Sequence, residues 1–310
     1  WENWNSTKQD AARAYFLERN PDVIIFGGPY DDKNADRVVS IAGSQERTNV
    51  ATFDWIALYA ALYNKEAMSN RIRAETQADY DCSSANARLA SSTQRKAEVE
   101  ENTPVLLWAN WFEGYNWSVA ECSTWDETYY CEYAKHCNID IISRPEGFGW
   151  NNPDFGGRYW YLNDEQFLEL GKNADYWIYP SQFWDKMYEK KKDVVQQMKA
   201  YQTKQVFDTQ GMGENSWYEQ RLAEYDVVGL DMCDIVGHTT GVHKRRWIRN
   251  IFTDPIGSLP ACNVNELDAP YVPEGTDCVP FGQGGVMSGA FLTFPGVWVL
   301  VGLVGMSLVL

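Results

Sequence analysis

The sequence predicts an α/β fold with two lobes joined by a long helix. Short apolar runs bounded by Gly, Pro and Asp alternate with helical segments at both ends of the chain. Between them lies a proline-free stretch, and the alternation resumes after Pro104. Alternating strands and helices build largely parallel sheets, and 310 residues supply enough core for two such lobes.

Residues 1–53 form the first lobe. A short helix at Ala11–Arg19 leads to the apolar run Val23–Phe26, which is followed by the glycine turn Gly27–Tyr30. This order of helix, strand and turn is one α/β unit, and Val38–Ala42 supplies a second short strand.

Residues 54–100 form a helical connector. The segment is rich in Ala, Arg, Glu and Gln, contains no proline, and is interrupted only by the weak Cys82-Ser83-Ser84 sequence. Its apolar residues recur near the helical period, so one or two long helices are predicted. The shared face comprises Trp55, Leu58, Tyr59 and Leu62.

Residues 101–253 form the second, larger α/β lobe. We expect strands at Val105–Leu107, Ile139–Ile142, Trp177–Tyr179, Gln205–Phe207 and Val227–Leu230. We expect helices at Thr124–Lys135, Asn163–Asn173, Phe183–Tyr201 and Ser216–Glu224, with Lys244–Phe252 closing the lobe.

The net charge and the composition of the two chain ends limit which partners are possible. The formal net charge of −16 argues against nucleic acid, which needs basic patches. The chain starts at Trp1 without a signal-peptide pattern, so we expect a processed or truncated fragment. Residues 254–285 are a cysteine-containing loop and linker, and residues 286–310 are a hydrophobic membrane-anchor segment. A lipid anchor or a buried terminal helix are the alternatives to a transmembrane helix.

The cysteines indicate disulfides rather than a metal site. There are seven, with no C-x-x-C spacing and no histidine at ligand spacing to them. Together with the anchor, they indicate an oxidising compartment, although their pairing is left open. Two glycosylation sequons begin at Asn5 and Asn116, and the second lies in a segment where a glycan would crowd the proposed ligand site. The cysteines are Cys82, Cys122, Cys131, Cys137, Cys233, Cys262 and Cys278.

An aromatic segment is the main functional signal. Trp108–Trp117 follows a predicted strand and holds more aromatic side chains than one strand needs for packing. Ligands bind at the carboxyl ends of strands in open α/β sheets, so we expect a cleft there for a large, flat, partly apolar ligand. The other strand-end segments are Gly27–Tyr30, Arg144–Trp150, Pro180–Trp184 and Asp208–Trp217, and Arg158–Tyr161 is expected to project from a loop.

These segments define the candidate ligand site. The residues expected to contact the ligand are Tyr30, Trp108, Asn110, Trp111, Phe112, Tyr115, Trp117, Arg144, Phe148, Trp150, Tyr159, Trp184 and Gln210. Trp55, Trp125, Trp177 and Trp247 are assigned to the core. We expect His238 and His243 to make hydrogen bonds rather than bind cobalt. No catalytic residue, metal ligand or bound cofactor is predicted.

Short motifs in both lobes resemble a known family. The run Asn20–Ile25 is similar to the Lys-Pro-Asp-Leu-Val-Ile strand entry of substrate-binding proteins for cobalamin and iron chelates. Asn163–Ile178 resembles the corresponding unit of their second lobe, with Ala174 in place of proline. The resemblance covers roughly residues 10–253, and each motif alone is weakly specific. It implies two α/β lobes joined by a rigid helix, with the ligand between them.

The aromatic insertions, acidic charge and apolar tail most resemble the algal cobalamin acquisition proteins, which are cell-surface relatives of that family. This resemblance implies a non-enzymatic receptor that captures cobalamin or a similar corrinoid and passes it to an unidentified membrane transporter or receptor. It also implies that the first lobe is incomplete before Trp1. The alternatives are a haem or ferric-chelate binding protein of the same fold, and a secreted carbohydrate-active enzyme or lectin.

Overall fold

The structure is a computed structural model of the chain. It describes residues 22–27, 38–41, 46–96, 103–120, 128–143, 147–151, 159–214, 216–239, 243–259 and 278–280, together with a few isolated residues. The second lobe and the connector fall largely within these ranges. Of the first lobe, two strands and the entry to the connector are described.

Two short strands are described in the segment predicted to form the first lobe. β1 (Ile24–Gly27) and β2 (Val38–Ile41) pair in parallel, with Ile24 opposite Val38. Both strands were predicted from their apolar runs, and the structure confirms them. Of the helix expected at residues 11–19, four residues lie outside the described ones; Ala11, Ala14, Tyr15 and Glu18 are described and are helical, which agrees with the prediction.

Residues 105–250 contain an eight-stranded mixed sheet within the described residues, in the order β10-β9-β8-β3-β4-β7-β6, with β5 paired to β3. β3 pairs in parallel with β5 and β8, and β8 pairs in parallel with β9, whereas the remaining pairs are antiparallel. The bounds are β3 Val105–Phe112, β4 Asn116–Ala120, β5 Asp140–Ile141, β6 Trp150–Asn151, β7 Tyr159–Leu162, β8 Tyr176–Tyr179, β9 Val206–Asp208 and β10 Arg249–Asn250.

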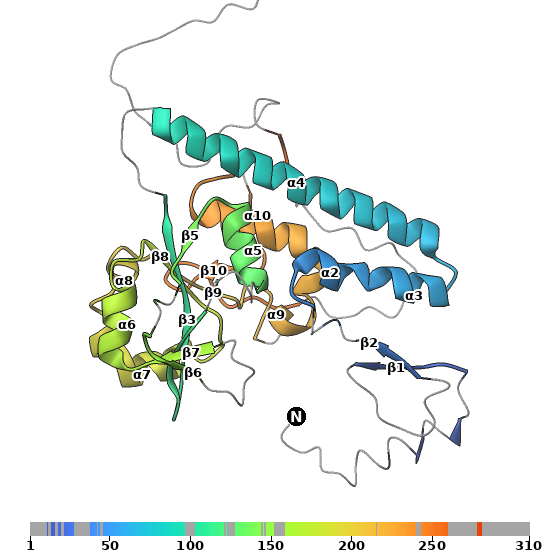
Figure 1. Cartoon of the computed structure of the whole chain (residues 1–310), viewed down its shortest axis with the longest axis horizontal. Coiled ribbons are helices and arrows are strands. Elements are labelled where there is room, and N and C mark those ends of the chain that lie inside the picture. The colour runs from blue at the N-terminus through green and yellow to red at the C-terminus, as the bar shows by residue number, and fades with distance from the viewer. Residues whose placement is uncertain are drawn as a thin grey trace, which may run out of the picture.

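Helices cover both faces of this sheet. In Figure 1, α6, α7 and α8 lie to the left of the strands, and α5, α10 and α4 lie to the right and above. The bounds are α2 Asn49–Asp54, α3 Ile56–Leu62, α4 Glu66–Lys96, α5 Tyr129–His136, α6 Asp164–Gly171, α7 Trp184–Val195, α8 Lys199–Gln202, α9 Ser216–Glu219, the 3₁₀ helix η4 Arg221–Glu224 and α10 Tyr225–Ile235.

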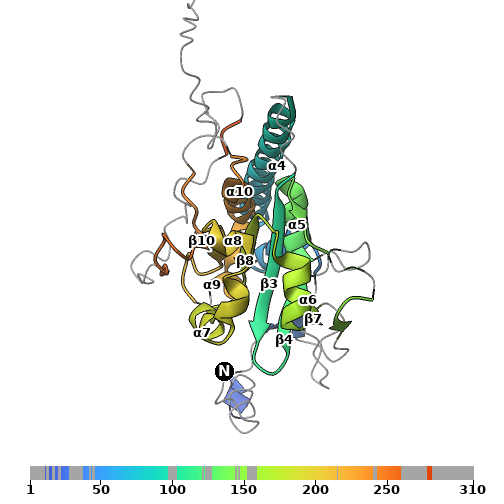
Figure 2. The same cartoon turned by 90° about the vertical axis from the view of Figure 1, so that its left-hand side faces the viewer.

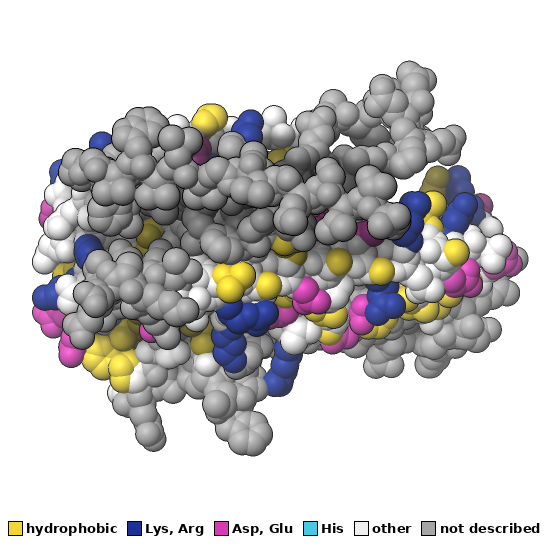
Figure 3. All heavy atoms as spheres, turned by 90° about the horizontal axis from the view of Figure 1, so that it is seen from above, with side chains coloured by type: hydrophobic (Ala, Val, Ile, Leu, Met, Phe, Trp, Pro, Cys, Tyr) yellow, Lys and Arg dark blue, Asp and Glu magenta, His cyan; other side chains and the backbone are white. Residues whose placement is uncertain are grey.

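One or two long helices were predicted for residues 54–100, and the structure has one long helix, α4, preceded by the short helix α3. The break between them is not at the place predicted from the sequence. α3 ends at Leu62 and α4 begins at Glu66, and between them Asn64 adopts a left-handed conformation with φ of 55°. Asn tolerates this conformation better than most residues. The Cys82-Ser83-Ser84 sequence, expected to be the weak point, lies inside α4. Seen from the α4 side, basic and acidic side chains are interspersed on the surface (Figure 3).

The strand predicted at Val227–Leu230 is wrong, because this run lies in the helix α10. Residues all around this helix are buried, so its apolar positions form a continuous run that resembles a buried strand. Gly229 lets the helix approach the connector: an added Cβ would lie 2.9 Å from the Tyr80 ring of α4. The segment expected to close the lobe contains the short strand β10 at Arg249–Asn250.

The aromatic segment is a β-hairpin rather than a loop. β3 continues to Phe112, a turn follows in which Gly114 has φ of 87°, and β4 begins at Asn116. Tyr159–Leu162, also expected in a loop, forms β7 and pairs with β4. Aromatic residues fit a pleated sheet well, and antiparallel pairing extends the parallel sheet at this edge. The prediction missed this extension because it assumed that each strand ends after three or four residues.

Two hydrophobic cores lie on opposite faces of the sheet. The core under α4, α5 and α10 includes Trp108, Tyr130 and Trp217. The core under α6, α7 and α8 includes Trp117 and Trp177. Trp177 and Trp247 are buried as predicted, whereas Trp55 is only partly buried and Trp125 lies outside the described residues.

Three disulfides are formed: Cys82–Cys278, Cys122–Cys131 and Cys137–Cys233. They agree with the predicted use of cysteines, and Cys262 lies outside the described residues. His136, Cys137 and Cys233 lie close together, but both thiols are in a disulfide and so cannot bind a metal as thiolates. Within the ranges described above, no helix has both the length and the apolar character needed to cross a bilayer, and residues 286–310 fall outside those ranges.

The interface between α4 and α10 contains an acidic group whose ionisation should oppose folding. Burial raises the pKa of Asp226 to about 7, and the neighbouring Asp79 and Glu224 add to this effect. Because the folded-state pKa is raised, the stability contributed by the protonated group is present below about pH 4. It is lost as pH rises through 7.

We therefore expect Asp226→Asn to stabilise the protein at pH 8 by about 2–4 kcal/mol, and to have little effect at pH 4. Urea unfolding at the two pH values measures the difference. Asp193→Asn, which changes an exposed carboxylate of α7, should alter stability by less than about 0.5 kcal/mol at either pH. Equal effects of Asp226→Asn at both pH values would contradict the assignment.

Candidate functional site

One face of the antiparallel part of the sheet carries a row of polar and aromatic residues. Asn110 of β3 is opposite Ser118 of β4, Ser118 is opposite Tyr161 of β7, and Tyr161 is opposite Trp150 of β6. Residues directly opposite each other on neighbouring strands share a face of the sheet. The row therefore crosses four strands on the face that also carries Trp108 and Phe112, because side chains alternate along β3.

A pocket of about 70 Å³ opens on this face. β3 contributes three of its lining residues, and the segments after β8 and β9 contribute Pro180 and Tyr218. Two of the strand-end segments predicted from the sequence, Trp108–Trp117 and Pro180–Trp184, therefore meet here. Tyr218, the residue directly after a third predicted segment, joins them. The lining residues are Trp108, Asn110, Phe112, Ser118, Tyr129, Tyr130, Pro180 and Tyr218.

The floor of the pocket is polar and uncharged. Asn110 and Ser118, the pair we call the polar floor, are 8% and 2% exposed. The Ser118 hydroxyl has no hydrogen-bond partner within the described residues. Since buried polar groups are nearly always paired in folded proteins, an unpaired hydroxyl facing a pocket indicates that a ligand or a water molecule completes it.

The walls of the pocket are fixed by aromatic packing. Trp108 stacks on Tyr130 with ring centroids 5.1 Å apart, and Trp217 packs against Trp108 at 6.1 Å. Tyr218 is held by a hydrogen bond of 2.7 Å from its hydroxyl to the carbonyl oxygen of Pro180. The pocket is thus bounded by rigid rings rather than by flexible side chains.

Four half-exposed aromatic side chains form what we call the aromatic rim. Phe112 and Tyr218 line the pocket and are 42% and 59% exposed. Trp150 and Tyr115 are each 44% exposed and pack on Tyr161, with ring centroids 4.7 and 5.9 Å from it. Burial raises the pKa of Tyr161, so this ring stays neutral between them. Exposed aromatic surface concentrated in this way is typical of a binding site.

Strand alternation places other predicted residues on the opposite face. Trp117 is fully buried, stacks on Phe167 at 3.9 Å, and donates its indole N–H to Asp164 at 2.8 Å. Trp111 packs on the same side, and Trp184 is buried in that core. The sequence prediction grouped these residues with Trp108 because it treated the whole segment as a loop, in which alternation has no meaning.

The remaining predicted residues lie elsewhere. Gln210 is buried and donates its side-chain N–H to Asp208 at 2.8 Å, and Phe148 packs against the second core. Tyr30 and Arg144 lie outside the described residues, as does the side chain of Tyr159 in β7. The sequence prediction missed Ser118, Tyr129, Tyr130 and Tyr218. Recognising Glu113–Tyr115 as a hairpin turn would have placed Ser118 beside Asn110.

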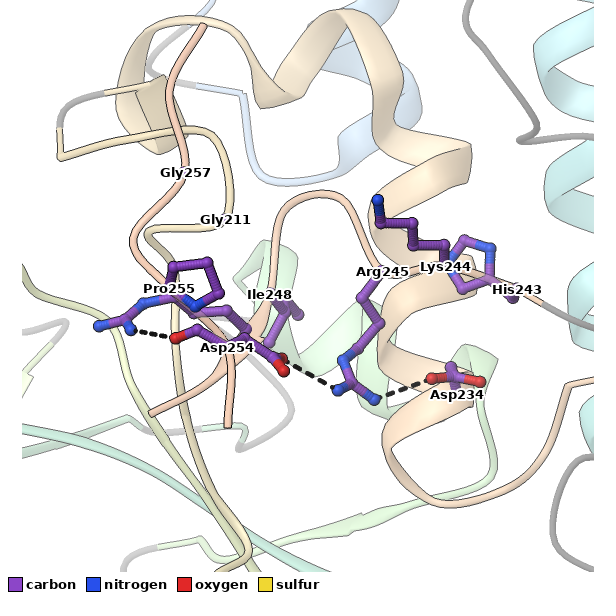
Figure 4. Close-up of a pocket in the computed structure, with 10 residues that line it drawn as sticks. Gly211, Asp234, His243, Lys244, Arg245, Ile248, Asp254, Pro255 and Gly257 are labelled. Atoms are coloured by element: carbon purple, nitrogen blue, oxygen red, sulfur yellow. Dashed lines mark hydrogen bonds and ion pairs between the residues drawn. The ribbon is translucent and has the colours of Figure 1, made fainter. Parts of the chain in front are cut away.

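A second cavity, of about 430 Å³, lies between the end of α10 and the segments after β9 and β10 (Figure 4). Arg245 crosses it and pairs with Asp234 at 2.9 Å and Asp254 at 3.3 Å, as the dashed lines show. Arg249 pairs with Asp208 at 2.6 Å. A ligand would have to displace these ion pairs, and the described lining contains no Phe, Tyr or Trp. This cavity therefore suits a large flat ligand less well than the aromatic rim.

Both singled-out histidines make hydrogen bonds, as predicted. His238 Nδ1 lies 2.7 Å from the carbonyl oxygen of Cys137. His243 Nε2 lies 2.6 Å from the buried Asp231 carboxylate.

Comparisons with known proteins identify no family. No protein-family model matches the chain, and no curated protein matches it. A periplasmic haem-binding protein of Pseudomonas aeruginosa is 10% identical with a TM-score of 0.48, over 69% of this chain and 72% of the other. A periplasmic haem-binding protein of Vibrio cholerae is 14% identical with a TM-score of 0.46, over 70% and 78%.

A siderophore-binding protein of Vibrio cholerae, solved with Fe³⁺-Desferal, is 15% identical with a TM-score of 0.45, over 72% of this chain and 78% of the other. Similarity at this level assigns neither a family nor a ligand. The function is therefore argued from the residues of the pocket and the rim.

Proposed function

We propose that this chain is a non-enzymatic binding protein that captures cobalamin, or a similar corrinoid, for uptake. The observation that carries the proposal is the aromatic rim, two of whose residues line a small pocket that contains no charged side chain among its described lining residues. A corrin ring is broad, with apolar faces and a border of amide groups. Rigid aromatic side chains offer large contact areas to such a ring at low entropic cost, and a few polar groups fix its orientation.

The size of the pocket determines how the ligand would lie. A cavity of about 70 Å³ is too small for a macrocycle. It has roughly the volume of two water molecules, which suits one small substituent of a larger ligand. We therefore place the ring across Phe112, Tyr115, Trp150 and Tyr218, with one substituent entering the pocket.

The disulfides support a location outside the cytosol. Three of them in one chain are typical of secreted and cell-surface proteins. We propose that residues 286–310 anchor the chain to the membrane. Cys278 is bonded to Cys82 of α4, and Asn86 donates to the Val279 carbonyl at 2.9 Å, so the tail would leave beside α4. The β3–β4 hairpin lies at the end of the sheet away from α4, so the ligand site would face away from the membrane (Figures 1 and 2).

The composition of the pocket supports binding over catalysis. Ser118 could serve as a nucleophile only with a general base beside it, and none of the described lining residues is a His, Lys, Asp or Glu that could act as one. A glycoside hydrolase would need two carboxylates about 5–10 Å apart across the site. A haem or ferric-chelate ligand remains the alternative within the same architecture, and a membrane transporter or receptor is the expected partner.

Replacing rim residues should weaken cobalamin binding without unfolding the protein. We expect Phe112→Ala and Trp150→Ala each to lower the affinity about tenfold, because each loses aromatic contact worth about 1–2 kcal/mol. Fluorescence titration of the 310-residue chain measures this loss. Phe252→Ala, which truncates a partly exposed aromatic packed on Tyr201, is the matched control and should bind like the wild type. Normal binding by both rim variants would show that the site is elsewhere.

A further inference from the structure

We infer that the polar floor recognises an uncharged primary carboxamide on the ligand and discriminates against a carboxylate at the same position. Asn110 and Ser118 are the specificity-determining residues. The inference rests on the proposed function and deepens it, because it selects corrinoids with intact side-chain amides from other large flat ligands.

The geometry of the floor matches a carboxamide. Asn110 and Ser118 are directly opposite each other on β3 and β4, so their side chains lie side by side in the lining of the pocket. The Asn110 amide offers both donors and an acceptor, and the Ser118 hydroxyl offers one donor and two acceptor positions. A ligand carboxamide has the same two kinds of group, so it can both donate to and accept from the floor.

The side chains that line the pocket supply no charge. All the described lining residues are uncharged. Arg221 contacts one of the lining residues: its guanidinium lies over the Tyr129 ring at 4.0 Å and donates to the Trp217 carbonyl at 2.8 Å. It contacts the wall residue Tyr129 and is not among the residues that line the pocket. A carboxylate entering the pocket would therefore lose its hydration without gaining an ion pair, whereas a carboxamide would lose much less.

The enclosed position of the floor strengthens this discrimination. Both floor residues are more than nine-tenths buried, and aromatic rings surround them. In such a site an unmatched polar group is costly, so a ligand that satisfies the Ser118 hydroxyl is favoured over one that does not. Sites that hydrogen-bond a substrate group discriminate more strongly than apolar pockets, for the same reason.

The most direct test changes the ligand rather than the protein. The wild-type chain is titrated with cyanocobalamin and, separately, with each monocarboxylate obtained by hydrolysing one peripheral amide of cyanocobalamin. We expect at least one monocarboxylate to bind about tenfold more weakly or worse at pH 8, while the others bind like the parent. A difference in affinity between these ligands cannot result from misfolding, because the same wild-type protein is used throughout.

Two variants test the residues themselves. Asn110→Asp, which is nearly isosteric, should weaken cyanocobalamin binding about tenfold or more, and Ser118→Ala about threefold to tenfold. Asn173→Asp, which adds the same charge at an exposed position after α6, should have no effect. Unchanged thermal unfolding would show that each variant is folded.

The outcomes separate this inference from the proposed function. Suppose that cyanocobalamin binds the wild type and that the rim variants bind it more weakly. If every monocarboxylate then binds the wild type as tightly as cyanocobalamin does, and both floor variants bind cyanocobalamin as tightly as the wild type does, the carboxamide inference is overturned and the binding function stands. If cyanocobalamin shows no saturable binding to the wild type, the proposed function itself fails.

Discussion

Replacing Trp117 with Ala is expected to lower the free energy of unfolding by about 3–5 kcal/mol, because the change opens a cavity in a well-packed core. The Trp117 ring is fully buried between β4 and α6, where it stacks on Phe167 with an interplanar angle of 4°. Its indole N–H donates to Asp164, which also pairs with Lys191 at 2.8 Å. The substitution therefore removes both the packing and the partner of a carboxylate.

Urea unfolding followed by circular dichroism measures this change. Trp150→Ala is the matched comparison, because Trp150 lies on the other face of the sheet and is half exposed. We expect it to cost no more than about 1 kcal/mol of stability and to reduce ligand affinity instead. If Trp117→Ala left stability unchanged and abolished binding, our assignment of the two faces would be reversed.

Replacing Asp231 with Ala is expected to cost about 3–5 kcal/mol of stability, because it leaves several buried donors without an acceptor. The Asp231 carboxylate is fully buried in α10 and accepts the backbone N–H groups of Arg246, Trp247 and Ile248 at 2.6–3.1 Å. It also lies 2.6 Å from His243 Nε2. These bonds attach the segment before β10 to the helix.

Thermal and urea unfolding of Asp231→Ala test this role. Asp231→Asn keeps one acceptor oxygen and should lose less stability than the Ala variant. Asp185→Ala removes an exposed carboxylate in the first turn of α7 and should cost less than about 1 kcal/mol. A stability of Asp231→Ala equal to that of the wild type would contradict the assigned role of the carboxylate.

The local signals in the sequence were sufficient for the parallel part of the fold. Apolar runs bounded by turn residues correctly predicted β1, β2, β8 and β9, and the proline-free stretch correctly predicted the connector. The antiparallel edge was missed, because the pairing of β4 with β7 depends on contacts between distant residues rather than on local pattern. The run at 227–230 was assigned to a strand because a helix buried on all sides shows no amphipathic period.

The candidate site was also predicted only in part: the residues on β3 were expected from the sequence, and those on α5 were not. Trp108, Asn110 and Phe112 were expected to contact the ligand, and all three line the pocket. The sequence could not reveal Tyr129 or Tyr130, because α5 reaches the pocket only through tertiary packing. The expectations for Tyr30, Arg144 and the anchor at 286–310 fall outside the described residues and stay predictions.

The most direct test of the account is to identify the ligand that the aromatic rim binds. The 310-residue chain would be titrated with cyanocobalamin, haem, a ferric siderophore and an oligosaccharide under the same conditions, with its tryptophan fluorescence as the signal. We predict saturable quenching by cyanocobalamin at the lowest concentration of the four, and weaker cyanocobalamin binding by Phe112→Ala and Trp150→Ala. Tight binding of haem, a siderophore or a sugar, with no saturable response to cyanocobalamin, would contradict the account.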